Sequence, residues 1–171
     1  MQDCIIYENC KQKNSEQCNE CCWKYIQLKF QHAVSNIPLG YKYPIYMDTC
    51  NGSDVDVTSY RYLGDYMQNI YRNVNVNHEG LYLWSKTKGN GKTTWAIKIL
   101  YEYFKQLHPT IESFEQPKGI YINVPILFKK SRDNIDNPSD EFKKLEKTIV
   151  NADLVVFDDI GTEAPTKWVK E

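Results

Sequence analysis

A short segment rich in glycine and lysine, near the middle of the chain, has the residue types needed to hold a polyphosphate. Glycines let the backbone curl so that its N–H groups point inward around phosphate oxygens. The segment follows an apolar run at 81–84 and precedes a long helical pattern, whose start would add a positive dipole end. Lys92 would reach the β- and γ-phosphates, and Thr93 would offer its hydroxyl to Mg²⁺. The predicted nucleotide-binding residues are Lys88, Gly89, Asn90, Gly91, Lys92, Thr93 and Thr94.

One position departs from the full phosphate-loop pattern, G-x-x-x-x-G-K-[ST]. Its first glycine falls at position 86, where this chain has Lys86. A lysine is accepted there when its φ is negative, so we expect the bend between strand and loop to differ. The alternative interpretation is an ordinary glycine turn before a helix, and a second motif argues against it.

That second motif is a pair of acids at the end of an apolar run. Residues 154–157 are Leu-Val-Val-Phe, and Asp158 and Asp159 follow them. Ligands of parallel sheets bind at the carboxyl ends of strands, so both acids are expected to face the crevice of the phosphate loop. Asp158 would hold Mg²⁺ through water, and Asp159 would polarise an attacking water. The alternative is a strand followed by an acidic turn. Lys92, Asp158 and Asp159 are the predicted catalytic residues of an ATPase.

Apolar periodicity predicts the elements that position these motifs. Leu63, Tyr62, Tyr66, Met67 and Ile70 share one helical face, with Thr58 or Ser59 as the cap; Ala96, Ile99, Leu100, Tyr103, Phe104 and Leu107 share another. Pro125 would open a third helix, and Ser139 would cap a fourth. Strands are expected at 81–84, 120–124 and 154–157. Strands alternating with helices indicate an α/β fold with a parallel sheet that is covered on both faces.

Five of the six cysteines lie in the first 22 residues. Cys18 and Cys21 have the spacing of half a zinc knuckle, and Cys4 and Cys10 could complete a tetrahedral site, with Cys22 as a substitute for Cys21. So short a segment has too few residues for a core of its own, which gives Zn²⁺ a structural task. The alternative is reduced cysteines packed among apolar side chains. His32 is the nearest further candidate ligand.

Composition narrows the function classes. The chain has 171 residues and a net charge of −1, which excludes a polybasic nucleic-acid coat. Lys129, Lys130 and Arg132 could touch DNA phosphates locally, or form an ordinary solvated helix face. The N-terminus has no signal-peptide pattern, and no apolar run is long enough for a membrane span. We therefore expect a cytoplasmic protein without a membrane partner, and in that reducing compartment cysteines without disulfides.

Taken together, these segments resemble the DnaC/DnaI-type loaders of replicative helicases, which are AAA+ ATPases. Asp158-Asp159-Ile160-Gly161 is similar to their second nucleotide motif, Ser35-Asn36-Ile37-Pro38 to the segment before their ATPase core, and Ile122-Asn123-Val124-Pro125-Ile126-Leu127 to the stretch between their two motifs. The resemblance covers residues 34–171. The tyrosine- and lysine-rich style resembles a phage-encoded version, which would act in the host cytoplasm.

The resemblance implies a P-loop NTPase fold with an AAA+ core, ATP and Mg²⁺ as cofactors, and an oligomeric working state. It also implies a DnaB-type replicative helicase and single-stranded DNA as partners. The sequence divides into a Cys-rich segment, 1–33, a linker, 34–58, and an ATPase domain, 59–171. In the family, further strands, an arginine finger and a lid follow this stretch. Since the chain stops in an apparent helix after Pro165, we expect an incomplete sheet and weak turnover.

Two other functions fit the same residues. One is another P-loop enzyme, such as a small-molecule kinase or a DNA-packaging motor, although no arginine-rich lid is visible. The other is a zinc-dependent adaptor that binds the helicase and holds nucleotide with little turnover.

Overall fold

The computed structural model describes residues 10–11, 13–41, 57–86 and 88–162. Its elements, in chain order, are α1 (Trp23–Val34), α2 (Val57–Gln68), α3 (Ile70–Asn75), α4 (Lys92–Gln106), the 3₁₀-helix η2 (Ile111–Phe114), β1 (Gly119–Asn123), α5 (Val124–Asp133), α6 (Asp140–Asn151) and β2 (Leu154–Asp158). The predictions for Cys4, for residues 42–56 of the linker and for the stretch after Pro165 concern residues outside the described part of the chain.

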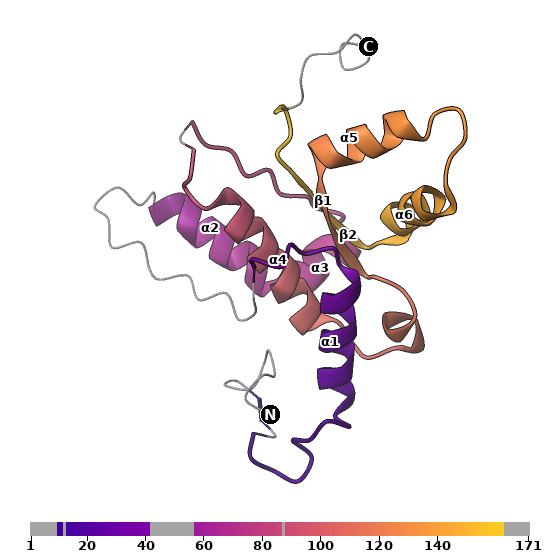
Figure 1. Ribbon diagram of the computed structural model, residues 1–171. Coiled ribbons are helices and arrows are strands. Elements are labelled where there is room, and N and C mark those ends of the chain that lie inside the picture. The colour runs from indigo at the N-terminus through magenta and orange to yellow at the C-terminus, as the bar shows by residue number, and fades with distance from the viewer. Residues whose placement is uncertain (1–9, 12, 42–56, 87, 163–171) are drawn as a thin grey trace.

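The two strands pair in parallel, from Gly119 opposite Leu154 to Asn123 opposite Asp158. In Figure 1, α2, α3 and α4 lie on one side of this pair and α5 and α6 on the other. The strands predicted at 120–124 and 154–157 are confirmed as β1 and β2, and so is their parallel direction. The crossover between them contains α5 and α6, as a parallel connection requires.

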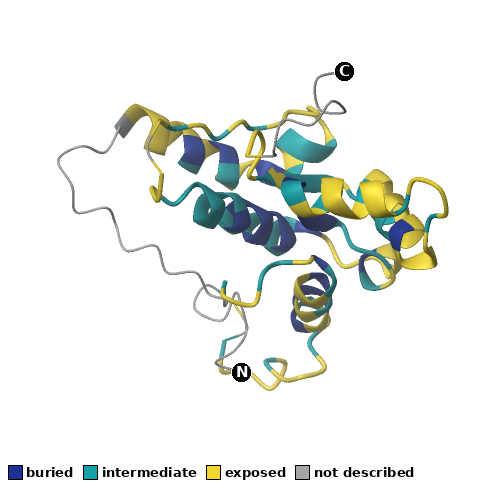
Figure 2. Cartoon of the chain, turned by 45° about the horizontal axis from the view of Figure 1, so that its top comes forward, coloured by how far each residue is buried: buried dark blue, intermediate teal, exposed yellow. Residues whose placement is uncertain are grey.

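Helix α4 is the centre of the core. Figure 2 shows buried residues concentrated along it, whereas α5 and α6 are mostly exposed. The predicted apolar stripe is confirmed from Ile99 to Leu107, and Ile97 and Tyr101 are buried too. A helix buried on more than one side needs neighbours on each, and α1, α2, α3, β1 and β2 all contact α4.

The strand predicted at 81–84 is wrong, because the described residues hold a sheet of two strands that does not include it. The alternation of side chains is nevertheless strand-like. Leu81 and Leu83 pack against the core, whereas Tyr82 and Trp84 are 75% and 66% exposed. A strand requires a hydrogen-bonded neighbour, and sequence periodicity cannot show whether one is present.

The expectation that both faces of the sheet are covered is also wrong for β2. Its residues are only partly buried, and Phe157 is 47% exposed. A continuous apolar run predicts burial on both faces only when helices cover both, and the described elements leave part of β2 open.

Helix starts were predicted with mixed success. Ser139 caps α6 as expected, since its hydroxyl accepts from the Phe142 N–H at 3.2 Å. The helix expected near 59–70 begins earlier, at Val57, so neither Thr58 nor Ser59 is its cap. It also breaks at Asn69 into α2 and α3, and its residue Tyr62 is exposed, not inward.

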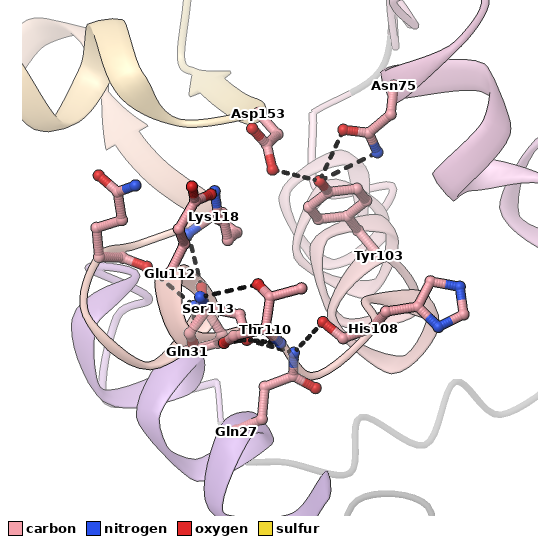
Figure 3. Close-up of polar contacts among 11 residues, drawn as sticks. Gln27, Gln31, Asn75, Tyr103, His108, Thr110, Glu112, Ser113, Lys118 and Asp153 are labelled. Carbon is pink, nitrogen blue, oxygen red and sulfur yellow. Dashed lines mark hydrogen bonds and ion pairs between the residues drawn. The ribbon is translucent and has the colours of Figure 1, made fainter.

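Helix α1 joins the core through buried polar side chains (Figure 3). Gln27 Nε2 donates to the carbonyl of His108 and to the hydroxyl of Ser113, at 3.0 and 2.9 Å. Gln31 Nε2 donates to the carbonyls of Ser113 and Gln116, and its Oε1 accepts from the Lys118 N–H at 2.7 Å. Both glutamines are 0% exposed, and their buried polar groups have hydrogen-bond partners, most of them backbone atoms.

The amine of Lys24 extends this interface. It donates to Gln27 Oε1 at 2.9 Å and to the carbonyls of Phe104 and Leu107 at the end of α4. Those carbonyls have no partner inside their own helix, so the lysine satisfies them. Burial lowers the pKa of Lys24 to about 8.

Within the described residues, no helix is both long and apolar enough to cross a membrane.

Candidate nucleotide site

The glycines of the predicted phosphate loop adopt a backbone conformation that suits the tight curl expected of them. Gly89 and Gly91 have φ of +76° and +82°, in the left-handed region that side chains disfavour. A Cβ on Gly89 would meet no atom within 4 Å, so glycine is required here by conformation and not by space. Helix α4 starts directly after Gly91, without a side-chain cap. Its first N–H groups therefore face the loop, as an anion site requires.

The Asn90 side chain is hydrogen-bonded to one residue before the loop and to one residue after Asn90. Lys92 Nζ donates to Asn90 Oδ1 at 3.0 Å, and Asn90 Nδ2 donates to the hydroxyl of Ser85. Lys88, like Lys86 at the departing position, is exposed, while Thr94 is half-buried in the first turn of α4. The loop and the residues before it thus carry three lysines, and positive charge is what a polyphosphate needs.

The two predicted motifs meet in space. Thr93 Oγ1, in the first turn of α4, donates to Oδ2 of Asp158, the last residue of β2, at 2.8 Å. These residues are 65 positions apart in the sequence. A hydroxyl and a carboxylate oxygen are hard oxygen donors of the kind that Mg²⁺ prefers, and Mg²⁺ in proteins usually completes its octahedral shell with waters. The residues present therefore fit the predicted ion.

Asp158 has a second partner that sequence reasoning missed. Tyr121 of β1 donates its hydroxyl to the same Oδ2, at 2.7 Å. Burial and the hydrogen bond to Asp158 raise the pKa of Tyr121, so the hydroxyl keeps its proton and acts as a donor. Its strand register, opposite Val156, places it beside Asp158. An isolated apolar strand gives no sign of this, because register between strands is not a local property.

Asp159 is held from the same neighbouring strand. Asn123 Nδ2 donates to Asp159 Oδ2 at 2.9 Å, and Asn123 Oδ1 also caps α5 by accepting from the Ile126 N–H at 3.2 Å. Asp159 itself has φ of +60°, which turns the chain sharply after β2. The sequence did show Asn123 as the last residue before a helix, which is a capping position, but not its contact with Asp159.

A cavity of about 330 Å³ adjoins the end of β1. Its lining includes Asn36 and Pro38, Tyr121 and Asn123 of β1, and Lys130 of α5. The segment at 35–38, singled out by the resemblance, thus lies near the site residues of β1. Lys130 pairs with Glu141 at 3.3 Å, and its neighbours Lys129 and Arg132 are exposed on α5. A DNA contact by this face stays a prediction.

The zinc prediction is not supported by a ligand cluster in the described residues. Cys10, Cys18, Cys21 and Cys22 are free thiols, and no three His, Cys, Asp or Glu side chains gather as metal ligands in the described part of the chain. Because Cys4 lies outside that part, the predicted ligand set stays a prediction. His32 instead stacks on Tyr101, with ring centroids 5.6 Å apart.

No protein-family model, curated protein or solved structure matches this chain. The assignment of the site therefore depends on its geometry and on the two sequence motifs.

Proposed function

We propose that the chain binds ATP with Mg²⁺ at the start of α4 and hydrolyses it. The observation that supports this most directly is the hydrogen bond between Thr93 and Asp158. A glycine turn and an acidic turn could each occur by chance. Their meeting at one point, with the hydroxyl of one on the carboxylate of the other, is what a shared Mg²⁺ site requires.

Each residue then has a defined task. The N–H groups of the loop and the amine of Lys92 would bind the β- and γ-phosphate oxygens, and Thr93 and Asp158 would hold Mg²⁺. Bound Mg²⁺ would offset charge that develops on those oxygens. Asp159 would orient a water and accept its proton as the water oxygen bonds to the γ-phosphorus. The bond from that phosphorus to the bridging oxygen breaks, which yields ADP and phosphate.

Affinity for ATP tests this proposal. Titration calorimetry with Mg·ATP should give a saturable isotherm, and Lys92→Ala should weaken binding roughly 10- to 100-fold, since a charged hydrogen bond contributes about 1.5–3 kcal/mol. Lys105→Ala is the matched control, because Lys105 lies in the last turn of the same helix and pairs with Glu102. Equal loss in both variants, or no binding by the unaltered chain, would contradict the proposal.

The resemblance to helicase loaders extends the proposal to a client. The chain would help place a DnaB-type ring helicase on single-stranded DNA, with the Cys-rich segment and Zn²⁺ forming the docking part, and would work as an oligomer. Size-exclusion chromatography with the replicative helicase should show co-elution, which Cys18→Ser combined with Cys21→Ser should abolish. Absence of co-elution would leave an ATPase without this client. Turnover that Lys92→Ala does not change would favour an adaptor over an enzyme.

A further inference from the structure

Tyr121 is hydrogen-bonded both to the candidate site and to the residue that follows α1. Its hydroxyl donates to Asp158 Oδ2 at 2.7 Å, and its backbone N–H donates to the carbonyl of Ser35, the residue after α1, at 2.8 Å. The side chain is 6% exposed. A buried residue held at both ends in this way has little freedom to turn, so its hydroxyl lies at a fixed place relative to β2.

Asp158 Oδ2 accepts hydrogen bonds from two hydroxyl groups, those of Thr93 and Tyr121, which differ in character. Thr93 belongs to the first turn of α4 and must present its own oxygen to a cation. Tyr121 belongs to the neighbouring strand, and a phenolic hydroxyl is not among the usual ligands of Mg²⁺. Its hydroxyl is therefore not itself a competing ligand of the ion. What it fixes is the rotation of the carboxylate about its final bond, which is otherwise broad for aspartate.

We infer that Tyr121 is the positioning residue for Mg²⁺ at this site: its hydroxyl holds the Asp158 carboxylate in the orientation that a cation shared with Thr93 needs. The inference rests on the proposed function, because it concerns the same ion. Partners that orient a metal-bound carboxylate from behind commonly contribute 10- to 100-fold to metal affinity. Tyr121 is neutral and makes one bond, so an effect of about 10-fold is expected.

The place of Tyr121 is itself determined by α1. Gln31 Oε1 accepts from the Lys118 N–H, just before β1, and the Ser35 carbonyl accepts from the Tyr121 N–H. The side of β1 that faces away from β2 is thus hydrogen-bonded by the end of α1. Ser35 is 0% exposed, and its hydroxyl donates to the His32 carbonyl at 2.9 Å. This anchors Tyr121 independently of any ion.

The experiment compares nucleotide binding with and without the metal. A fluorescent ATP analogue is titrated into the unaltered chain and into Tyr121→Phe, first in EDTA and then at increasing Mg²⁺. Tyr121→Phe should raise the half-saturating Mg²⁺ concentration about 10-fold and leave binding in EDTA unchanged. Mn²⁺ binding in the presence of ATP, followed by electron paramagnetic resonance, should weaken by a similar factor.

Tyr103→Phe is the matched control. Tyr103 is also buried, and its hydroxyl donates to a carboxylate, Asp153 Oδ2, at 2.9 Å, at the other end of β2 from Asp158. It should leave the Mg²⁺ dependence unchanged. A Mg²⁺ dependence that is the same in Tyr121→Phe as in the unaltered chain would overturn the inference alone. So would an equal loss of binding with and without Mg²⁺, which would indicate a merely structural role. If the unaltered chain bound no ATP, the proposed function itself would fail.

Discussion

Two groups of polar residues in this protein are built in opposite ways. At the interface of α1 with α4 and η2, Gln27 and Gln31 are completely buried, and their partners are mostly backbone atoms of other segments. At the candidate nucleotide site, Thr93 and Asp158 are half-buried, and their partners are other side chains. Backbone partners move only with the segment to which they belong, whereas the hydroxyl of Thr93 can rotate toward a ligand while Tyr121 stays in place. The first group therefore stabilises the fold, and the second is available for chemistry.

The largest effect on stability is expected at Gln31. Gln31→Leu would leave the carbonyls of Ser113 and Gln116 and the N–H of Lys118 without their partner. Each unpaired buried group costs about 1–3 kcal/mol, so we expect a loss of about 3 kcal/mol in the free energy of unfolding by urea. Gln68→Leu, at the exposed end of α2, is the control and should change it little. Similar losses in both would remove the distinction between the two groups.

A smaller loss of stability is expected at Gly119, the first residue of β1, which packs against α4. A Cβ on Gly119 would lie 2.5 Å from Leu100 Cδ1 and 2.7 Å from Phe104 Cε1, so Gly119→Ala forces these side chains or β1 itself to shift. Such overpacking costs about 2 kcal/mol. Gly64→Ala in α2 provides a control of opposite sign, because nothing lies within 4 Å of the added methyl group. It should stabilise the helix by about 0.5–1 kcal/mol. A thermal melt of each variant measures both.

The Lys24 amine at the interface of α1 and α4 predicts that the stability of the protein depends on pH. Burial lowers the pKa of Lys24 to about 8, below its ordinary 10.5. Between these values the unfolded chain binds more protons than the folded one, so stability contributed by Lys24 should rise with pH from about 8 to 10.5. Because the amine is partly exposed, screening reduces the effect to about 1 kcal/mol. Urea unfolding at pH 8 and 10 should show this rise in the unaltered chain and a smaller one in Lys24→Met.

The smallest effect on stability is expected at the candidate nucleotide site. Asp158→Asn keeps an oxygen that can accept from Thr93 and Tyr121, so the free energy of unfolding should change by less than about 0.5 kcal/mol. The same variant should lose the Mg²⁺ dependence of ATP binding. A loss of stability comparable to that of Gln31→Leu would show that the site is structural, and the contrast drawn above would be wrong.

The sequence predicted the local motifs correctly but did not reveal contacts that depend on how distant segments pack. Residues within one local motif were placed correctly: the glycines at 89 and 91 have positive φ, and Ser139 caps its helix. The meeting of Thr93 and Asp158 followed from two motifs and a general rule about strand ends. Tyr121 could not be found, because its role depends on the register of β1 against β2, which no local pattern encodes.

Helix α1 was missed for a related reason. Gln27 and Gln31 have the composition of a solvated surface, and most of the groups that satisfy them lie more than 80 positions away in the sequence. The error at 81–84 is the opposite one, because a strand was predicted there and none is present. The apolar alternation there is real, but alternation specifies which side chains point inward and not whether a neighbouring strand is present.

The polar contacts of α1 limit how this protein can be recombined. A hybrid joined at residue 33, with the N-terminal part of another protein grafted before it, would take Gln31 away from Lys118 and Lys24 away from the end of α4. Only a donor helix with amide side chains at the same two turns could replace them. Exchange of the Cys-rich segment is therefore expected to succeed at a junction before Trp23, where α1 begins, and to fail after it.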